Sequence, residues 1–78
     1  MNNEVKIIQA IAEHLGLLPE DVDRQSLLRD DLGLGPVELN DLLNDLSTKF
    51  DVIFNPEDTH ELQKVEDLVV LVEDNLLE

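Results

Sequence analysis

The chain contains no cysteine, which excludes disulfide bonds, thiolate chemistry and zinc sites with cysteine ligands. Long apolar runs are missing as well, since no stretch approaches the ~18 residues that cross a bilayer. The first residues, MNNEVKII, lack the basic start and the apolar run of a secretory signal. This pattern is compatible with a reducing compartment. We therefore expect a cytoplasmic protein that does not insert into membranes.

Aromatic and basic residues are scarce. The chain has two Phe and neither Trp nor Tyr, and 19 Asp and Glu outnumber five Lys and Arg to give a formal net charge of −14. Few rings are available to stack on bases, and the negative charge repels a phosphate backbone. We therefore expect no nucleic-acid binding, and a basic protein surface as the partner.

The length of 78 residues suits one small domain, residues 1–78, with no room for a separate catalytic domain. The apolar residues are mostly Leu, Val and Ile at helical spacing, which predicts an all-α fold with an aliphatic core. Helix I is expected from Val5 to Leu15, capped by Asn2 or Asn3 and ended by Gly16. Its predicted apolar stripe comprises Val5, Ile8, Ile11, Ala12 and Leu15.

The stretch from Leu17 to Gly35 has no sustained period and contains Pro19 and Gly33. We expect a long ordered loop, and connections of this length usually serve a function. Pro19 followed by two acidic residues predicts a single helical turn. The apolar residues expected to pin the loop to the bundle are Leu18, Val22, Leu27, Leu28 and Leu32.

Helix II is expected from Pro36 to Phe50, because proline suits the first helical position and leucines follow at spacings of three and four. A short helix III is expected from Pro56 to near Leu62, and helix IV from Lys64 to Leu76. The predicted core residues are Leu39, Leu42, Leu43, Leu46 and Phe50 on helix II, and Val65, Leu68, Val69, Val72 and Leu76 on helix IV. The pattern predicts a four-helix bundle with a long loop between helices I and II.

Local sequence makes this prediction more specific. The segment LGLLPEDVDRQSLLRDDLGLGPVELNDLLNDLSTKF resembles the run from the end of helix I through helix II in the acyl carrier protein family. Its clearest landmark is DDLG, from Asp30 to Gly33, followed seventeen residues after Gly33 by Phe50. The segment LQKVEDLVVLVEDNL, which ends at Leu76, resembles the last helix of the family. The resemblance implies an acyl-carrier-protein-like bundle that is not an enzyme.

One departure from the family falls on the functional atom. In the family, DLG is followed by one residue and then Asp-Ser-Leu, whose serine hydroxyl receives the phosphopantetheine arm; here these positions are Gly35, Pro36 and Val37. Proline has no oxygen to attack a pyrophosphate. Ser26 lies in the loop before DDLG, and Ser47 lies about 16 Å further along helix II. The sequence therefore predicts no phosphopantetheine cofactor.

The resemblance also implies a docking surface. Glu38 and Asp41 match acidic positions that pair with basic patches on partner enzymes of the acyl-transfer or synthase type. The full set of expected partner-binding residues is Asp30, Asp31, Val37, Glu38, Asp41 and Asp45. The match is incomplete, because Asn40 and Asn44 stand where the family commonly has apolar residues, and Ser47 and Thr48 replace further acids. An alternative register aligns Val-Glu-Leu, residues 37–39, with a similar tripeptide of the family, but it requires a deletion over the serine and supplies no serine.

No other chemistry has a clear signal in the sequence. The acidic stretches lack the alternating ligands and central glycine of an EF-hand loop. His14 and His60 are isolated and begin no metal-ligand pattern. Paired carboxylates occur throughout and mark no particular place. We therefore expect no metal site, no catalytic residues and no enzyme activity.

Three hypotheses remain. The leading one is a monomeric, acidic docking protein without the covalent arm, which binds partner enzymes near lipid or polyketide synthesis. The second is an atypical acyl carrier in fatty acid, lipid or polyketide synthesis, loaded at another residue or non-covalently. The third is a structural or regulatory helical bundle that binds a basic protein.

Overall fold

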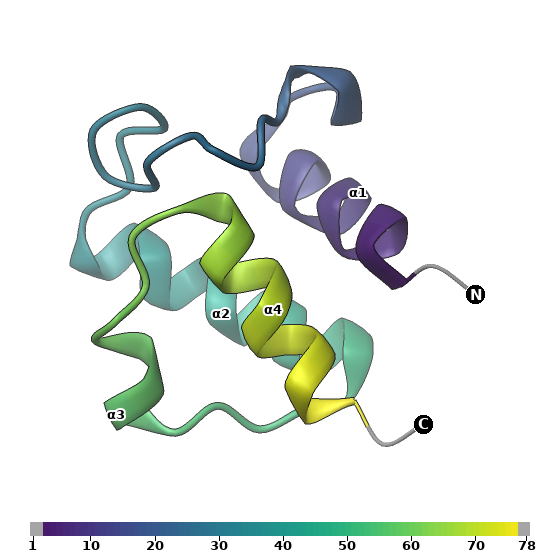
Figure 1. The fold of residues 1–78 in the computed structure, drawn as a ribbon, viewed down its shortest axis with the longest axis vertical. Helices are drawn as coiled ribbons and strands as arrows, with labels where there is room; N and C mark the ends of the chain where they lie inside the picture. The colour runs from purple at the N-terminus through teal and green to yellow at the C-terminus, as the bar shows by residue number, and fades with distance from the viewer. Residues whose placement is uncertain (1–2, 77–78) are drawn as a thin grey trace.

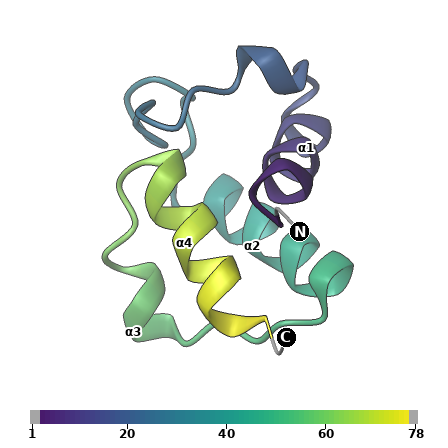
Figure 2. The ribbon, with the colours of Figure 1, turned by 45° about the vertical axis from the view of Figure 1, so that its right-hand side comes forward.

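The computed structural model describes residues 3–76, and in these residues helices pack into a small bundle (Figure 1). The elements in chain order are α1 (Asn3–Leu15), the 3-10 turn η1 (Pro19–Asp21), α2 (Pro36–Phe50), α3 (Pro56–Thr59) and α4 (Val65–Asn75). Extended pairing among the described residues is limited to one isolated bridge between Leu27 and Lys64. The predicted all-α class, four helices and long first loop are confirmed. Figure 2 shows α1 and α3 on opposite sides of the central α2 and α4.

Helix α1 begins earlier than expected, and its buried face includes the predicted Ile11 and Ala12 but not Val5. Asn3 is itself helical instead of capping the helix, and Asn2 lies outside the described residues. Ile7 and Ile11 are fully buried, whereas Val5 is 51% exposed, so its place in the predicted stripe was wrong. At 100° per residue, Val5 lies about 120° around the axis from Ile11, and therefore on the flank of the buried face. The helix ends as predicted, because Gly16 adopts a left-handed φ of 73°.

Four of the five residues predicted to pin the long loop are buried or partly buried, and one is exposed. Leu28 is buried as expected, but Leu18 is 59% exposed, and the buried Leu34 was not foreseen. The turn predicted after Pro19 is present as η1. Of the other predicted pins, Val22 is buried, and Leu27 and Leu32 are partly buried.

Backbone hydrogen bonds fasten the loop to the start of α4. The Leu28 amide donates to the carbonyl of Gln63 at 2.8 Å, and the Val65 amide donates to the carbonyl of Ser26 at 3.0 Å. The guanidinium of Arg24 adds ion pairs with Glu4 and with Glu66, the latter at 3.4 Å. The loop is therefore an ordered part of the fold.

Helices α2 and α4 supply the centre of the core as predicted. Leu42, Leu46, Val65, Leu68, Val69 and Val72 are fully buried. Leu39 and Phe50 pack against this core in partly buried positions. Fully burying an aliphatic side chain is worth ~1.5–3 kcal/mol, so these residues are a main source of the bundle's stability. Helix α2 ends at Phe50, and the following residue, Asp51, takes the left-handed conformation with φ of 55°.

The bounds of α3 and α4 differ slightly from the prediction. Helix α3 ends at Thr59 and does not reach Leu62, because the following segment must extend to pair Lys64 with Leu27. Helix α4 begins one residue after the predicted Lys64 and ends one residue before Leu76. Asp67 fixes its start, since its carboxylate accepts hydrogen bonds from the amides of Gln63 and Lys64.

Candidate functional site

The start of α2 is the place to which the sequence assigns the attachment position. Pro36 is the first helical residue, and Gly35 precedes it in extended conformation with φ of −79° and ψ of −177°. The Leu39 amide donates to the Gly35 carbonyl at 2.9 Å, which closes the first turn. Proline costs this turn no hydrogen bond, because the first helical N–H has no partner within the helix. Pro36 is solvent exposed and carries no side-chain oxygen or ionisable proton.

Glu38 folds back over this turn. One of its carboxylate oxygens lies 2.8 Å from the place that a Cβ atom on residue 35 would occupy. A carboxylate near a helix N-terminus is stabilised by the helix dipole. Glu38, one of the predicted docking residues, is exposed to solvent. Its carboxylate lies close to the backbone of Gly35, the residue that precedes the helix.

The outer face of α2 carries two further predicted docking residues, Val37 and Asp41. Val37 is 69% exposed and Asp41 is exposed, and no ion pair or side-chain hydrogen bond involves Asp41 among residues 3–76. Asn44, one turn further on, is also exposed. The exposed face of α2 therefore presents the apolar side chain of Val37, then the unpaired carboxylate of Asp41, and then the side-chain amide of Asn44.

Asp45 lies at the edge of this face, towards α1. Its carboxylate lies 3.2 Å from Nδ1 of His14 and 3.5 Å from Nζ of Lys49, and Lys49 in turn reaches Glu13 at 3.4 Å. Partial desolvation lowers the pKa of Lys49, but the carboxylates of Glu13 and Asp45 outweigh this effect and raise its pKa above the usual value. Asp45 is thus part of the contact between two helices.

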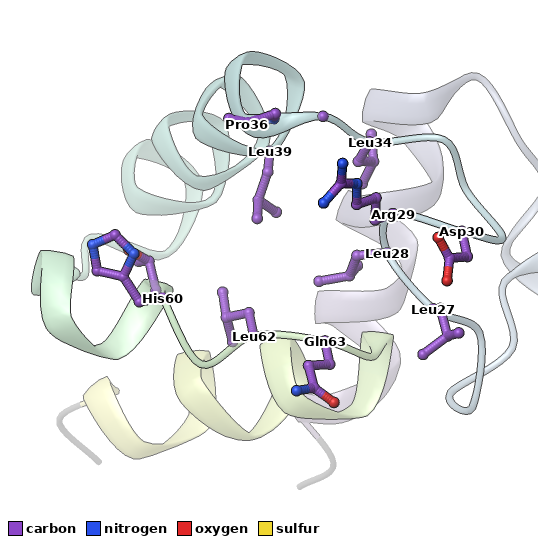
Figure 3. Close-up of a pocket in the computed structure, with 12 residues that line it drawn as sticks. Leu27, Leu28, Arg29, Asp30, Leu34, Pro36, Leu39, His60, Leu62 and Gln63 are labelled. Carbon is purple, nitrogen blue, oxygen red and sulfur yellow. The ribbon is translucent and has the colours of Figure 1, made fainter.

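The two acids of the DDLG segment have different surroundings. The carboxylate of Asp31 accepts a hydrogen bond of 2.7 Å from the Leu27 amide and so closes the turn that precedes α2. Asp30 is exposed, and it is one of the residues that line the cavity described below (Figure 3). The sequence grouped Asp30 and Asp31 as equivalent charges, and the structure separates them.

Neither serine lies at the start of α2. The hydroxyl of Ser47 donates to the carbonyl of Val52 at the other end of the helix. Ser26 sits in the loop, where its carbonyl accepts from the Val65 amide.

A cavity of about 780 Å³ lies between the loop, the first turn of α2 and the segment after α3 (Figure 3). Its walls include Leu28, Leu34, Leu39 and Leu62, and Pro36 and Gly35 line it at the α2 end. Arg29 also lines it, and sequence reasoning gave this residue no role. The sequence did contain an indication of its importance: Arg29 is one of only five Lys and Arg residues, and it lies between Leu28 and the DDLG segment. His60, which the sequence left isolated, stands on the side of α3.

The described part of the chain contains neither a candidate metal site nor a candidate membrane-spanning helix. Residues 3–76 hold no group of three or more His, Asp or Glu side chains arranged to bind a metal ion. Within the same residues, no helix has the length and apolar character needed to cross a membrane.

Comparisons with known proteins agree with this architecture. The family model described as the phosphopantetheine attachment site matches residues 5–72. An acyl carrier protein of Exiguobacterium sp. strain AT1b is 33% identical over 72 residues, covering 92% of this chain and 91% of that protein. An acyl carrier protein of Syntrophus aciditrophicus is 30% identical over 69 residues, covering 88% and 86% respectively. The crystal structure of an acyl carrier protein from Thermotoga maritima superimposes with a TM-score of 0.73 at 24% identity, covering 90% of this chain and 81% of that one.

The chain therefore belongs to the acyl carrier protein family. Members of this family are carriers in acyl-chain synthesis and not enzymes, which confirms the expectation of no enzyme activity. They interact with acyl-transfer and synthase enzymes, the partner class that the resemblance implied.

Proposed function

We propose that this protein is an acidic docking member of the acyl carrier family that works without a covalent phosphopantetheine arm. The observation that carries the proposal is Pro36 as the first residue of α2. Ester attachment needs a hydroxyl there, and the residues present do not fit the group. Ser47 supports the same conclusion, because its hydroxyl is bonded to Val52 at the far end of the helix.

Replacement of serine by proline leaves the scaffold intact. Gly35 and Pro36 form a regular helix start, and the core beneath is filled by buried Leu42 and Leu46. A lost attachment site in an intact bundle favours a role that depends on shape and charge. Docking on acyl-transfer or synthase enzymes, as a regulatory or scaffolding subunit, uses both.

The docking surface we propose is centred on Val37, Glu38 and Asp41. Val37 offers an exposed apolar contact, and the two acids offer charge to a basic partner surface. Asp30 adds long-range attraction from the neighbouring loop. Asp45 and Asp31 contribute to the negative field, but their carboxylates already serve contacts within the fold.

Intact mass spectrometry tests the missing arm. The chain is incubated with coenzyme A and a broad-specificity phosphopantetheinyl transferase, and no mass increase is expected. Addition of one phosphopantetheine would instead support the second hypothesis, an atypical carrier loaded at another residue.

Isolation of the natural complex separates docking from the third hypothesis, a structural or regulatory bundle for a basic protein. Cross-linking through the α2 face should recover a synthase or acyl-transfer enzyme. Recovery of a basic protein unconnected with acyl chemistry would contradict the docking proposal.

A further inference from the structure

A groove of about 270 Å³ lies between α2 and the segment that leads from α2 to α3 (Figure 1). Its lining carries no charged side chain, although 31% of the residues in the chain are charged. Leu43 and Phe54 supply apolar surface inside it. The volume is below the ~300–1,000 Å³ of small-molecule pockets. The groove therefore suits one side chain of a longer molecule better than an enclosed small ligand.

Two side-chain amides in this groove have no partner. Asn40 and Asn44 lie one turn apart on α2, are exposed, and form no side-chain hydrogen bond among residues 3–76. The two hydroxyls in the lining are already used, since Ser47 and Thr59 donate to backbone carbonyls. Each free amide offers two donors and one acceptor to a bound molecule.

The segment after α2 adds unpaired backbone groups. Burial alternates along it, with Val52 4% exposed, Ile53 82% exposed and Phe54 half-buried, which is the alternation of an extended chain. Within the described residues, the backbone amides of Ile53 and Phe54 donate to no acceptor. Unpaired backbone beside an exposed apolar side chain is the arrangement that an added strand satisfies.

We propose that this groove binds an extended peptide segment of a partner protein, with an apolar side chain against Ile53 and Phe54. The backbone of the peptide contacts the amides of Asn40 and Asn44. Residues four apart on a helix have Cβ atoms ~5–6 Å apart, close to the ~6.4–6.8 Å that two residues of an extended chain cover. A helical segment would offer these amides no free backbone groups, because its own are paired within the helix.

Charge determines which residues flank the apolar one in the peptide. Asp41 and Glu57 each follow a lining residue in the chain, are exposed, and form no ion pair among residues 3–76. They attract Lys or Arg on either side of the apolar residue. A second copy of this chain, with a net charge of −14, is repelled.

This inference rests on the docking proposal for the class of partner, and it adds the form of the segment that is recognised. The two can fail separately, because docking depends on the charges of Glu38 and Asp41, and the groove on uncharged amides. If charge reversal slows association with the enzyme and no peptide binds, the groove alone is removed. If the peptide binds and charge reversal leaves enzyme association unchanged, the docking surface alone is removed.

Amide chemical-shift titration of the full chain tests the groove. The probe is the capped pentapeptide Lys-Thr-Ile-Thr-Lys, whose β-branched residues favour an extended chain. The wild-type chain should bind one peptide, with shifts at the amides of Asn44, Ile53 and Phe54. Asn40→Ala with Asn44→Ala should weaken binding about tenfold, since each exposed neutral hydrogen bond contributes about threefold.

The matched control is Gln9→Ala with Gln63→Ala. Both glutamines are exposed, have no side-chain hydrogen bond within residues 3–76, and lie outside the groove lining. This variant also removes two amides without changing net charge, and it should bind the peptide as the wild-type chain does. Equal weakening by the control and by the asparagine variant would overturn the proposal.

A peptide methylated on the isoleucine nitrogen separates backbone recognition from side-chain contact. It keeps every charge and side chain and loses one donor, so the wild-type chain should bind it about threefold more weakly. Equal affinity for the two peptides would overturn the proposal, as would no binding of the unmodified peptide or shifts confined to other amides. Shifts of the groove amides on dilution of the chain alone would assign the groove to a second copy, and would overturn it too.

Discussion

The carboxylate of Asp45 on α2 lies 3.2 Å from Nδ1 of His14 on α1, so one of the acids assigned to docking joins two helices. Asp41, one turn earlier on α2, is exposed and has no such partner among the described residues. The two acids have the same chemistry and neighbouring positions. Their different surroundings lead to opposite expectations for stability and for binding.

Asp45→Asn should therefore lower stability, and Asp41→Asn should not. The contacts of Asp45 are partly exposed, with 30% of its side chain accessible, so the expected loss is about 0.2–1 kcal/mol. This corresponds to a fall in Tm of about 1–8 °C for a chain of this size. Both variants remove one negative charge, so the difference between them isolates the contact from the change in net charge. Equal Tm values in thermal unfolding at low salt would contradict the assignment.

The ion pairs of Lys49 with Asp45 and Glu13 should make the stability of the protein depend on pH in the alkaline range. The pKa of Lys49 is raised in the folded chain, so its contribution is complete below the unfolded value of ~10.4 and is lost as pH rises through the higher folded value. Stability measured by denaturant unfolding should fall above that pH in the wild-type chain. Lys49→Met should show a smaller fall over the same window, and an unchanged fall would exclude Lys49 as its source.

Leu46→Ala should be far more damaging than a surface truncation. Leu46 is fully buried, and removing its methyl groups costs about 2–5 kcal/mol through lost burial and the resulting cavity. Ile53 is 82% exposed, so Ile53→Ala should change the free energy of unfolding by no more than ~0.5 kcal/mol. Urea unfolding followed by circular dichroism measures both values. Similar losses in the two variants would mean that α2 does not pack as described.

Charge reversal at Glu38 and Asp41 tests the docking surface. The double variant to Lys should slow association with the partner enzyme about tenfold at low salt, with circular dichroism unchanged. The control is Glu73→Lys with Asp74→Lys, which alters net charge equally at exposed sites on α4. The difference between the variants should shrink near 1 M salt, where charges are screened beyond ~3 Å. Equal slowing by both double variants would leave no role for the α2 face in particular.

Helical periodicity was enough to predict most of the fold, and its failures have physical causes. Leu42, Leu46, Val65 and Val72 occupy the predicted core because α2 and α4 are long enough for their stripes to be unambiguous. Val5 was misplaced because an apolar residue on the flank of a helix fits the same spacing as one at its centre.

The loop could not be predicted in the same way, because it has no period to follow. Leu18 and Leu34 have the same side chain, yet tertiary packing leaves the first exposed and the second buried. The roles of the acidic residues could not be predicted from the sequence either. Asp31 and Asp45 looked like surface charges, and only the arrangement of the backbone and of His14 reveals that their carboxylates serve contacts within the fold.

The most direct test of the account is intact mass after treatment with coenzyme A and the transferase, with the wild-type chain and the double variant Gly35→Asp with Pro36→Ser measured in parallel. The double variant restores the family's acid and hydroxyl, and the side chain added at residue 35 displaces only the flexible Glu38 carboxylate. We expect the variant to gain one phosphopantetheine and the wild-type chain to gain none. A gain in the wild-type chain would contradict the account.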